Sequence, residues 1–160
     1  MSKEEEELYP DIEEWLRVYL TEKYSANKII TTHKTCRQTL DVCLRDLGIE
    51  IKEAIGLSIK VDIVGILTRG QKVQLVFVEV KDQPLTLKDL GQLWGYTQLL
   101  NPAESFLISS KGLGALERIF KIYKREDLLR YGPGHSSMMK VCKWNTGSGS
   151  IDYGSLIPRL

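Results

Sequence analysis

The stretch that decides the fold is Val73-Gln74-Leu75-Val76-Phe77-Val78-Glu79-Val80-Lys81, an apolar run that ends in two charged side chains. Its β-branched and aromatic residues predict a buried strand. Side chains two residues apart share a face of a strand, so Phe77, Glu79 and Lys81 point the same way. Burying an unpaired charge costs several kcal/mol. The pattern therefore predicts that Glu79 and Lys81 are paired with each other, with a cation, or with both.

A second β-rich run, residues 59–67, lies just upstream and is followed by a short turn-forming stretch. We therefore expect the two runs to form a β-hairpin. Pairing Leu67 with Gln74 places Asp62 opposite Glu79 on the same face, whereas a shift by one residue turns the two carboxylates to opposite faces. The sequence leaves both registers open. A shared site requires the first register, or one two residues away from it.

Two carboxylates on neighbouring strands suit metal-assisted hydrolysis, because Mg²⁺ takes oxygen ligands and keeps several waters. Lys81 would then orient or help to deprotonate an attacking water, or neutralise charge on a phosphate. A salt bridge between Lys81 and either acid is the alternative that the local pattern leaves open. The stretch Glu50-Ile51-Lys52 has the same acid-x-Lys spacing but no long apolar strand before it, so we expect no site there.

Two stretches and the helix expected after them resemble the signature of the PD-(D/E)xK nuclease superfamily: Val61-Asp62-Ile63-Val64-Gly65 and Phe77-Val78-Glu79-Val80-Lys81. Val61 stands where the name of the superfamily has proline. The resemblance implies a restriction-endonuclease-like core that hydrolyses DNA. It also implies that Mg²⁺, or Mn²⁺ in its place, is bound by Asp62, Glu79 and the backbone of Val80. By the same resemblance Lys81 is the catalytic lysine, acting together with the two acids.

The segment after Lys81 predicts a helix from Leu87 to Leu100, because Thr86 and Asp89 match a capping box. Its expected core stripe is Leu87, Leu90, Leu93, Trp94 and Thr97. Gly91 and Gly95 each cost such a helix on the order of 1 kcal/mol relative to alanine. Close approach of a strand or of a nucleic-acid backbone would explain both glycines.

Three further residues are candidates for accessory roles. Gln92 and Tyr96 resemble the Gln-x-x-x-Tyr element of the RecB-like branch of the superfamily, which implies that they help to hold substrate. A solvated helix face explains the same two residues. Members of the superfamily often place a glutamate on the first helix near the metal, and Glu13, on a helix expected to start at Tyr9-Pro10, is the candidate here. Acids in a first helical turn also interact favourably with the helix dipole.

The fold class expected is α/β, with a mixed central sheet flanked by helices. We expect residues 1–160 to form a single nuclease-like domain with a short Gly/Ser-rich tail from about residue 147. The remaining elements predicted are a strand at 28–32, a helix at 35–47, a strand at 105–109, a basic helix at 113–129 and a strand at 138–144.

Charge is unevenly distributed along the chain. Residues 1–26 carry 3 basic and 8 acidic side chains, a net charge of −5, and residues 111–143 carry 8 basic and 3 acidic ones, a net charge of +5. Only the second stretch suits a polyanion. The candidates for phosphate contact are Lys111, Arg118, Lys121, Lys124, Arg125 and Arg130. A solvated helix face is the alternative for this stretch.

Composition narrows the location and the class of protein. Three cysteines without Cys-x-x-Cys spacing, and no signal peptide, favour reduced thiols in a cytoplasmic protein. No apolar run approaches the roughly 20 residues needed to cross a bilayer. Two hypotheses remain: a Mg²⁺-dependent nuclease acting on DNA, and a nucleic-acid-binding or assembly module that keeps the fold without cutting. The sequence leaves open DNA against RNA, strandedness, endonucleolytic against exonucleolytic cutting, and a homodimer.

Overall fold

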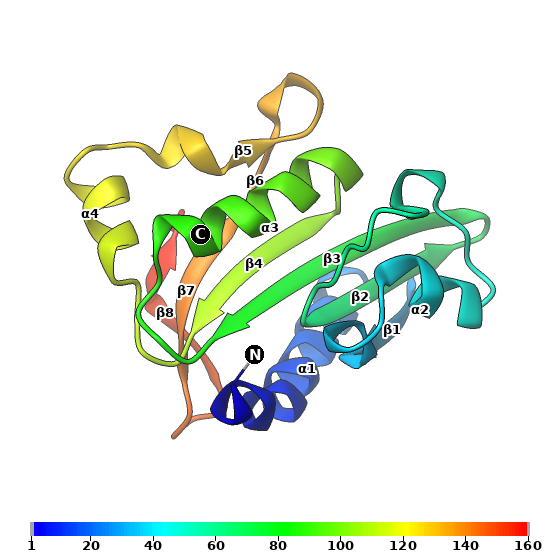
Figure 1. Cartoon of the computed structure of the whole chain (residues 1–160), viewed down its shortest axis with the longest axis horizontal. Coiled ribbons are helices and arrows are strands. Elements are labelled where there is room, and N and C mark those ends of the chain that lie inside the picture. Colours follow the sequence, from blue (N-terminus) through cyan, green and yellow to red (C-terminus); the bar gives the residue numbers. More distant parts are fainter. Residues whose placement is uncertain (1, 160) are drawn as a thin grey trace.

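A computed structural model describes residues 2–159 as a six-stranded sheet with helices on both faces (Figure 1). Within these residues the strands are β1 (Lys28–Thr32), β2 (Ile63–Arg69), β3 (Lys72–Lys81), β4 (Glu104–Ser109), β7 (Lys140–Asn145) and β8 (Ser150–Ile157). A separate small pair is formed by β5 (Arg130–Tyr131) and β6 (Ser137–Met138). The α-helices are α1 (Lys3–Lys23), α2 (Leu40–Asp46), α3 (Leu87–Leu100) and α4 (Ala115–Lys121).

The sheet is mixed, as predicted. Its strand order is β1-β2-β3-β4-β7-β8. The first three strands are antiparallel, β3, β4 and β7 are parallel, and β8 returns antiparallel to β7. Parallel neighbours need a crossover, which α3 provides between β3 and β4. Because β3 and β4 run in the same direction, their carboxyl ends lie at the same edge of the sheet.

Each face of the sheet has its own hydrophobic core. On one face α1 packs on alternate residues of the central strands, among them Val78, Val80 and Phe106. On the other face α2, α3 and α4 pack on the intervening residues, among them Phe77 and Leu107. Figure 1 shows α3 and α2 on the near face and α1 on the opposite one. Successive side chains of β3 therefore face opposite cores as far as Val80, as residues 73–81 predicted.

Helix α1 starts earlier than the sequence predicted. Ser2 is its N-cap and accepts a hydrogen bond from the Glu5 N–H, so the helix begins at Lys3 and Pro10 lies inside it. Acidic residues in the first turn favour an early start through the helix dipole. Pro10 removes one helical hydrogen bond, but the buried side chains of Tyr9 and Ile12 on either side of it hold the helix on the sheet.

Helix α3 has the predicted bounds and the predicted capping box between Thr86 and Asp89. Its core stripe is narrower than expected, because Leu87 and Trp94 are exposed while Leu90, Leu93 and Thr97 are buried. A Cβ atom added at either glycine of α3, Gly91 or Gly95, would meet no atom within 4 Å. The prediction that a strand of this protein approaches the two glycines closely is therefore wrong.

Three other predicted segments are corrected by the structure. The helix expected at 35–47 is a short 3₁₀ turn at Lys34–Cys36 followed by α2. The helix expected at 113–129 is α4 followed by a 3₁₀ turn at Glu126–Leu129, because Lys124 has a φ of 58°, outside the right-handed helical region. The strand expected at 138–144 is split between β6 and β7.

The Gly/Ser-rich stretch that begins at residue 147 is a turn and does not start a tail. Asn145 Oδ1 accepts the Gly147 and Ser148 N–H groups, and Gly149 has a φ of 65°. The turn leads into β8, whose Ile151 lies opposite Trp144 of β7. Glycine and serine in this stretch therefore form the tight turn that connects the paired strands β7 and β8.

Candidate functional site

The β2–β3 register brings two acidic residues together. Leu67 lies opposite Gln74 and Ile63 lies opposite Val78, so the next pair along the ladder is Asp62 and Glu79. The register that the shared site requires is thereby confirmed. Asp62 precedes the first residue of β2, and both acids are buried, with exposed fractions of 9% and 7%. Two carboxyl groups are thus enclosed where β2 begins and β3 ends.

Each carboxylate oxygen of Asp62 accepts one hydrogen bond. The Tyr9 hydroxyl donates to Oδ1 at 2.9 Å, and the Val80 backbone N–H donates to Oδ2 at 2.8 Å. One donor comes from α1 and the other from β3. Each oxygen retains lone-pair capacity beyond this single bond. Asp62 is therefore fixed in orientation while still able to bind a cation.

The direction of the Val80 N–H also places the Val80 carbonyl. In a strand, the N–H and C=O of one residue point to the same neighbouring strand. The Val80 N–H faces Asp62 on the β2 side, whereas the carbonyl of Lys81 accepts the Ser110 N–H at 3.1 Å on the β4 side. The Val80 carbonyl accordingly points toward the β2 side, where Asp62 lies.

Glu79 is the least satisfied polar side chain of the site. Its Oε2 atom is buried without a hydrogen-bond partner, and the Lys81 ammonium lies 3.9 Å from its Oε1. Burial raises the pKa of Glu79 well above its ordinary value, the negative charge of Asp62 and a hydrogen bond between the protonated Glu79 and Asp62 raise this pKa further, and Lys81 opposes the shift. A buried carboxyl group with a free oxygen beside a second carboxylate fits a site for a proton or a divalent cation.

A cation here would rely on few side chains. Within residues 2–159, no cluster of three or more His, Cys, Asp or Glu side chains has the geometry of a metal site. The ligands that the site offers are the carboxylates of Asp62 and Glu79 and the carbonyl of Val80. Such a sparse oxygen set suits Mg²⁺, which is commonly held by one or two carboxylates and several waters. It does not suit a structural zinc ion, which takes four protein ligands rich in Cys and His.

The acid of α1 expected near the metal, Glu13, is paired with a histidine. Glu13 Oε1 lies 2.9 Å from His33 Nδ1 at the end of β1. Glu5 is the α1 acid whose charge raises the pKa of Glu79. Glu5 is four residues, about one helical turn, before Tyr9. Glu5 lay outside the predicted helix, which began at Tyr9-Pro10, and Tyr9 was not among the predicted site residues.

The two helix residues expected to hold substrate are on α3. Gln92 is exposed, and Tyr96 is half-buried against the core beneath the helix. Within residues 2–159 no hydrogen bond joins either side chain to the two acids or to Lys81. Their accessory role stays a prediction.

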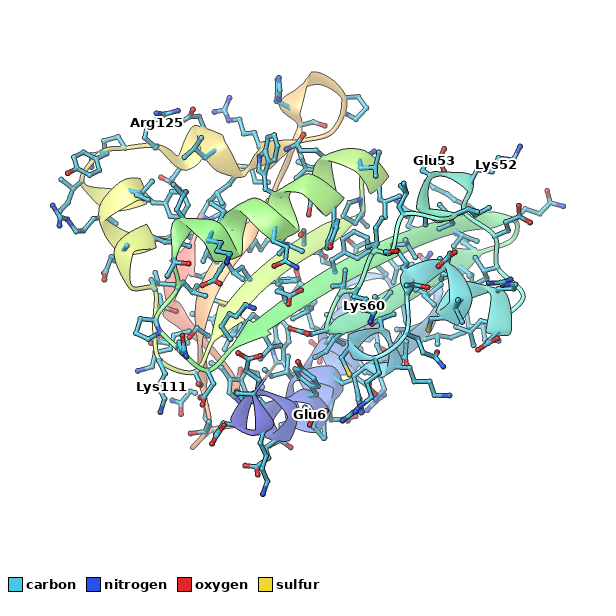
Figure 2. The ribbon with its side chains drawn as sticks, viewed as in Figure 1. Glu6, Lys52, Glu53, Lys60, Lys111 and Arg125 are labelled. Atoms are coloured by element: carbon cyan, nitrogen blue, oxygen red, sulfur yellow. The ribbon has the colours of Figure 1, made fainter. Side chains whose placement is uncertain are left out.

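Two of the basic residues expected to contact phosphate, Lys111 and Arg125, lie in different parts of the molecule, and several of the set have partners within the chain. Figure 2 shows Lys111 beside the loop that follows β4, at the carboxyl end of the parallel strands, and Arg125 near the far edge of the molecule. Lys121 pairs with Glu117 at 2.9 Å, and Arg125 pairs with Asp127 at 2.9 Å. Arg118 lies 3.5 Å from the hydroxyl of the exposed Tyr123. Of the predicted set, Lys111 lies on the same edge as Lys81.

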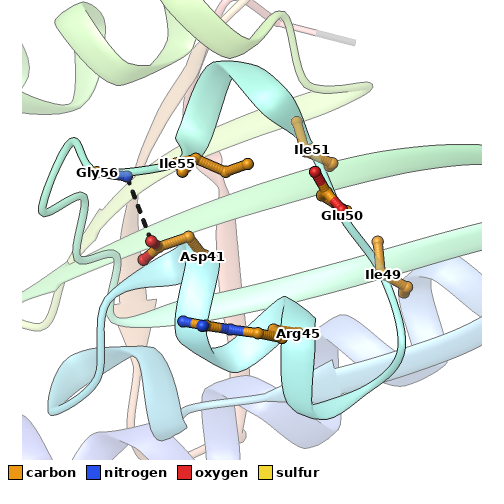
Figure 3. Close-up of a pocket in the computed structure, with 7 residues that line it drawn as sticks. All are labelled: Asp41, Arg45, Ile49, Glu50, Ile51, Ile55 and Gly56. Carbon is orange, nitrogen blue, oxygen red and sulfur yellow. Dashed lines mark hydrogen bonds between the residues drawn. The ribbon is translucent and has the colours of Figure 1, made fainter.

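A cavity of about 420 Å³ lies in a different part of the chain (Figure 3). It is lined by α2 and the segment after it: Asp41, Arg45, Ile49, Glu50, Ile51, Ile55 and Gly56. Asp41 accepts hydrogen bonds from the Gly56 and Val42 N–H groups and from the Thr39 hydroxyl. These bonds tie the segment to the start of α2, and they lower the pKa of Asp41, with the Thr39 bond contributing most.

Comparisons with protein-family models, curated proteins and solved structures find no match to this chain. Among residues 2–159, no helix is both long enough and apolar enough to span a membrane. Cys36, Cys43 and Cys142 are free thiols.

Proposed function

We propose that this protein is a Mg²⁺-dependent nuclease that hydrolyses phosphodiester bonds in DNA, as its resemblance to the PD-(D/E)xK superfamily implies. The observation that carries the proposal is the meeting of Asp62 and Glu79 across the β2–β3 ladder with one buried carboxylate oxygen left without a partner. Buried polar atoms without partners are rare in folded proteins and call for an explanation. A divalent cation bound between Asp62 and Glu79 would supply that partner, as would a proton shared between the two acids in the metal-free protein.

The proposed roles follow from what each group of the chain can do. Asp62, Glu79 and the Val80 carbonyl would hold the cation, which supplies positive charge next to a substrate phosphate. Lys81 lies on the same face of β3 as Glu79, and its side chain is 23% exposed. Its ammonium group can therefore reach both the buried acid and solvent. In this position it would orient an attacking water and stabilise the negative charge that develops on the phosphate.

A non-cutting module is the rival function, and the distance between Lys81 and Glu79 supports it in part. At 3.9 Å the two groups form an ion pair, which offsets some of the cost of burying Glu79 without any cation. This pair leaves Oε2 unsatisfied. The rival explains the contact of one Glu79 oxygen with Lys81 and needs a proton shared with Asp62 for the other, whereas a bound cation accounts for both oxygens.

Cleavage assays separate the two functions. Labelled single-stranded, duplex and branched DNA, with RNA in parallel, would be incubated with the purified chain in Mg²⁺ or Mn²⁺. Asp62→Asn and Lys81→Ala are expected to lower cleavage at least about 100-fold while retaining most binding. The matched control is Lys52→Ala, since the exposed Lys52 ends the other Glu-x-Lys triplet and lies on the opposite side of the molecule from Lys111 (Figure 2). If wild type cuts none of these substrates, the rival is correct.

We also propose that the substrate is DNA and that the protein is cytoplasmic. The three free cysteines are consistent with a compartment that keeps thiols reduced. The substrate panel tests DNA against RNA directly.

A further inference from the structure

A tyrosine on α1 makes a contact that the packing of the helix alone does not require. Tyr9 is 1% exposed and belongs to the apolar cluster between α1 and the sheet. Its ring would be buried equally well as phenylalanine. The hydroxyl nevertheless reaches the candidate site and donates to Asp62 Oδ1 at 2.9 Å, across 53 residues of sequence.

The hydroxyl acts on a side chain that needs its orientation fixed. Asp62 precedes β2, so the ladder of the sheet does not hold its backbone as it holds Ile63. The Val80 N–H binds one carboxylate oxygen, and Tyr9 binds the other. With one donor on each oxygen, rotation of the carboxyl group about its terminal bond would break both bonds. Asp62 is thereby held beside Glu79.

The hydroxyl is a permanent donor. Burial raises the pKa of Tyr9 above its ordinary value, and the negative charge of Asp62 and the hydrogen bond to it raise this pKa further. Tyr9 therefore keeps its proton throughout the pH range in which proteins function. The hydrogen bond from Tyr9 also stabilises the negative charge of Asp62, which reduces its repulsion of Glu79.

We propose that Tyr9 is a positioning residue that sets the affinity of the site for its divalent cation by orienting Asp62. This inference rests on the proposed function, because it assumes that Asp62 and Glu79 share a cation. Groups that orient metal ligands through a hydrogen bond typically contribute 10- to 100-fold in metal affinity or activity. Tyr9 does so from a helix that contributes no ligand of its own to the proposed set.

The same helix offers a matched control. The Tyr19 hydroxyl donates to Glu104 Oε1 at 2.7 Å, so α1 carries two tyrosines that each bind a buried carboxylate. Glu104 lies at the start of β4, whereas Glu79 lies near the carboxyl end of β3. Tyr9→Phe and Tyr19→Phe each remove a hydroxyl that donates to a buried carboxylate. Only the first change touches the candidate site.

Mn²⁺ binding by the metal-free protein, followed by electron paramagnetic resonance without nucleic acid, provides a readout other than activity. Tyr9→Phe is expected to weaken Mn²⁺ binding 10- to 100-fold, and Tyr19→Phe to leave it within about twofold of wild type. Circular dichroism would check that both variants are folded. A third variant with 3-fluorotyrosine at position 9 keeps the ring and the hydroxyl, and is expected to bind Mn²⁺ as wild type does.

Each outcome has a distinct meaning. If Tyr9→Phe binds Mn²⁺ as tightly as wild type while Asp62→Asn does not bind it, the positioning role is overturned and the proposed metal site survives. Equal weakening in Tyr9→Phe and Tyr19→Phe would overturn the role too, since it would reflect general loosening of α1. If wild type binds no Mn²⁺, the proposed function fails and the inference fails with it.

Discussion

The ammonium group of Lys81 lies 3.9 Å from Glu79 Oε1, while the second oxygen of Glu79 is buried without a partner. One positive charge therefore lies beside Glu79, whose neighbour across the β2–β3 ladder is a second carboxyl group, Asp62. Burial and the charge of Asp62 outweigh Lys81 and keep the pKa of Glu79 raised. Ionising Glu79 in the metal-free protein is therefore unfavourable, as expected where function and stability compete.

Replacing Glu79 by glutamine should stabilise the metal-free protein at neutral pH. A carboxyl group whose pKa is raised by folding destabilises the native state as pH rises above the unfolded pKa, which is about 4.3 for glutamate. Glu79→Gln is expected to gain roughly 1–3 kcal/mol at pH 7.5 and nothing near pH 4. Urea unfolding in chelator across this range measures the difference. A variant less stable than wild type at pH 7.5 would contradict this view of the site.

Glu104 should show the opposite pH dependence. Burial alone would raise its pKa, but the Tyr19 hydroxyl, Lys140 and the Tyr24 hydroxyl lower it below its ordinary value. The Lys140 ammonium lies 3.1 Å from Oε1, with Glu104 only 2% exposed. The stabilisation is therefore present above the unfolded pKa and is lost as pH falls through the lower folded pKa.

Glu104→Gln is accordingly expected to cost about 3 kcal/mol at pH 7, because Lys140 loses its buried partner. The loss should shrink as the solution is acidified toward the folded pKa of Glu104. Urea titrations at several pH values, run beside those of Glu79→Gln, check the prediction. Equal pH profiles for the two variants would show that these carboxyl groups do not occupy opposite electrostatic environments.

Local sequence signals predicted the elements that local forces determine. The strand at Lys28–Thr32 and the helix at Leu87–Leu100 have the expected bounds, because β-branched residues, a capping box and Asn101-Pro102 mark their limits. The register of β2 on β3 could be narrowed to two alternatives but not chosen. It depends on burying one face of each strand against helices that are distant in sequence.

Local sequence signals could not predict the contacts around Asp62. Tyr9 reaches it across 53 residues, and no sequence pattern marks a tyrosine as a hydrogen-bond donor to a particular acid. The exposed Trp94 was assigned to the core because a helical stripe does not reveal how much of it the neighbouring elements cover. Long-range packing decided both cases.

The glycines of α3 give a prediction in which stability and binding change in opposite directions. Gly91 and Gly95 have open space beside them, so Gly91→Ala with Gly95→Ala is expected to stabilise the helix by about 2 kcal/mol. The melting midpoint should rise by roughly 4–8 °C. If a nucleic-acid backbone uses the space, affinity for DNA should fall in the same variant.

Gly65 provides the contrast for this experiment. A Cβ atom there would lie 2.7 Å from Leu20 Cδ1 and 3.3 Å from Val76 Cβ, so Gly65→Ala should lower the melting midpoint. Calorimetry and a fluorescence-anisotropy titration of all the variants measure both effects. A double alanine variant that is more stable and binds DNA as wild type does would remove α3 from the proposed substrate surface.

The basic residues should contribute unequally to DNA binding. Lys111 follows Ser110, whose N–H binds the Lys81 carbonyl, so it lies at the edge of the sheet that holds the candidate site. Arg125 makes two hydrogen bonds to Asp127, and this ion pair must be broken before it can bind phosphate. Lys111→Ala is expected to weaken binding across sequences and to lower the slope of log affinity against log salt by about 1. Arg125→Ala should change that slope little, and the reverse order would place the nucleic acid over α4, away from Asp62 and Glu79.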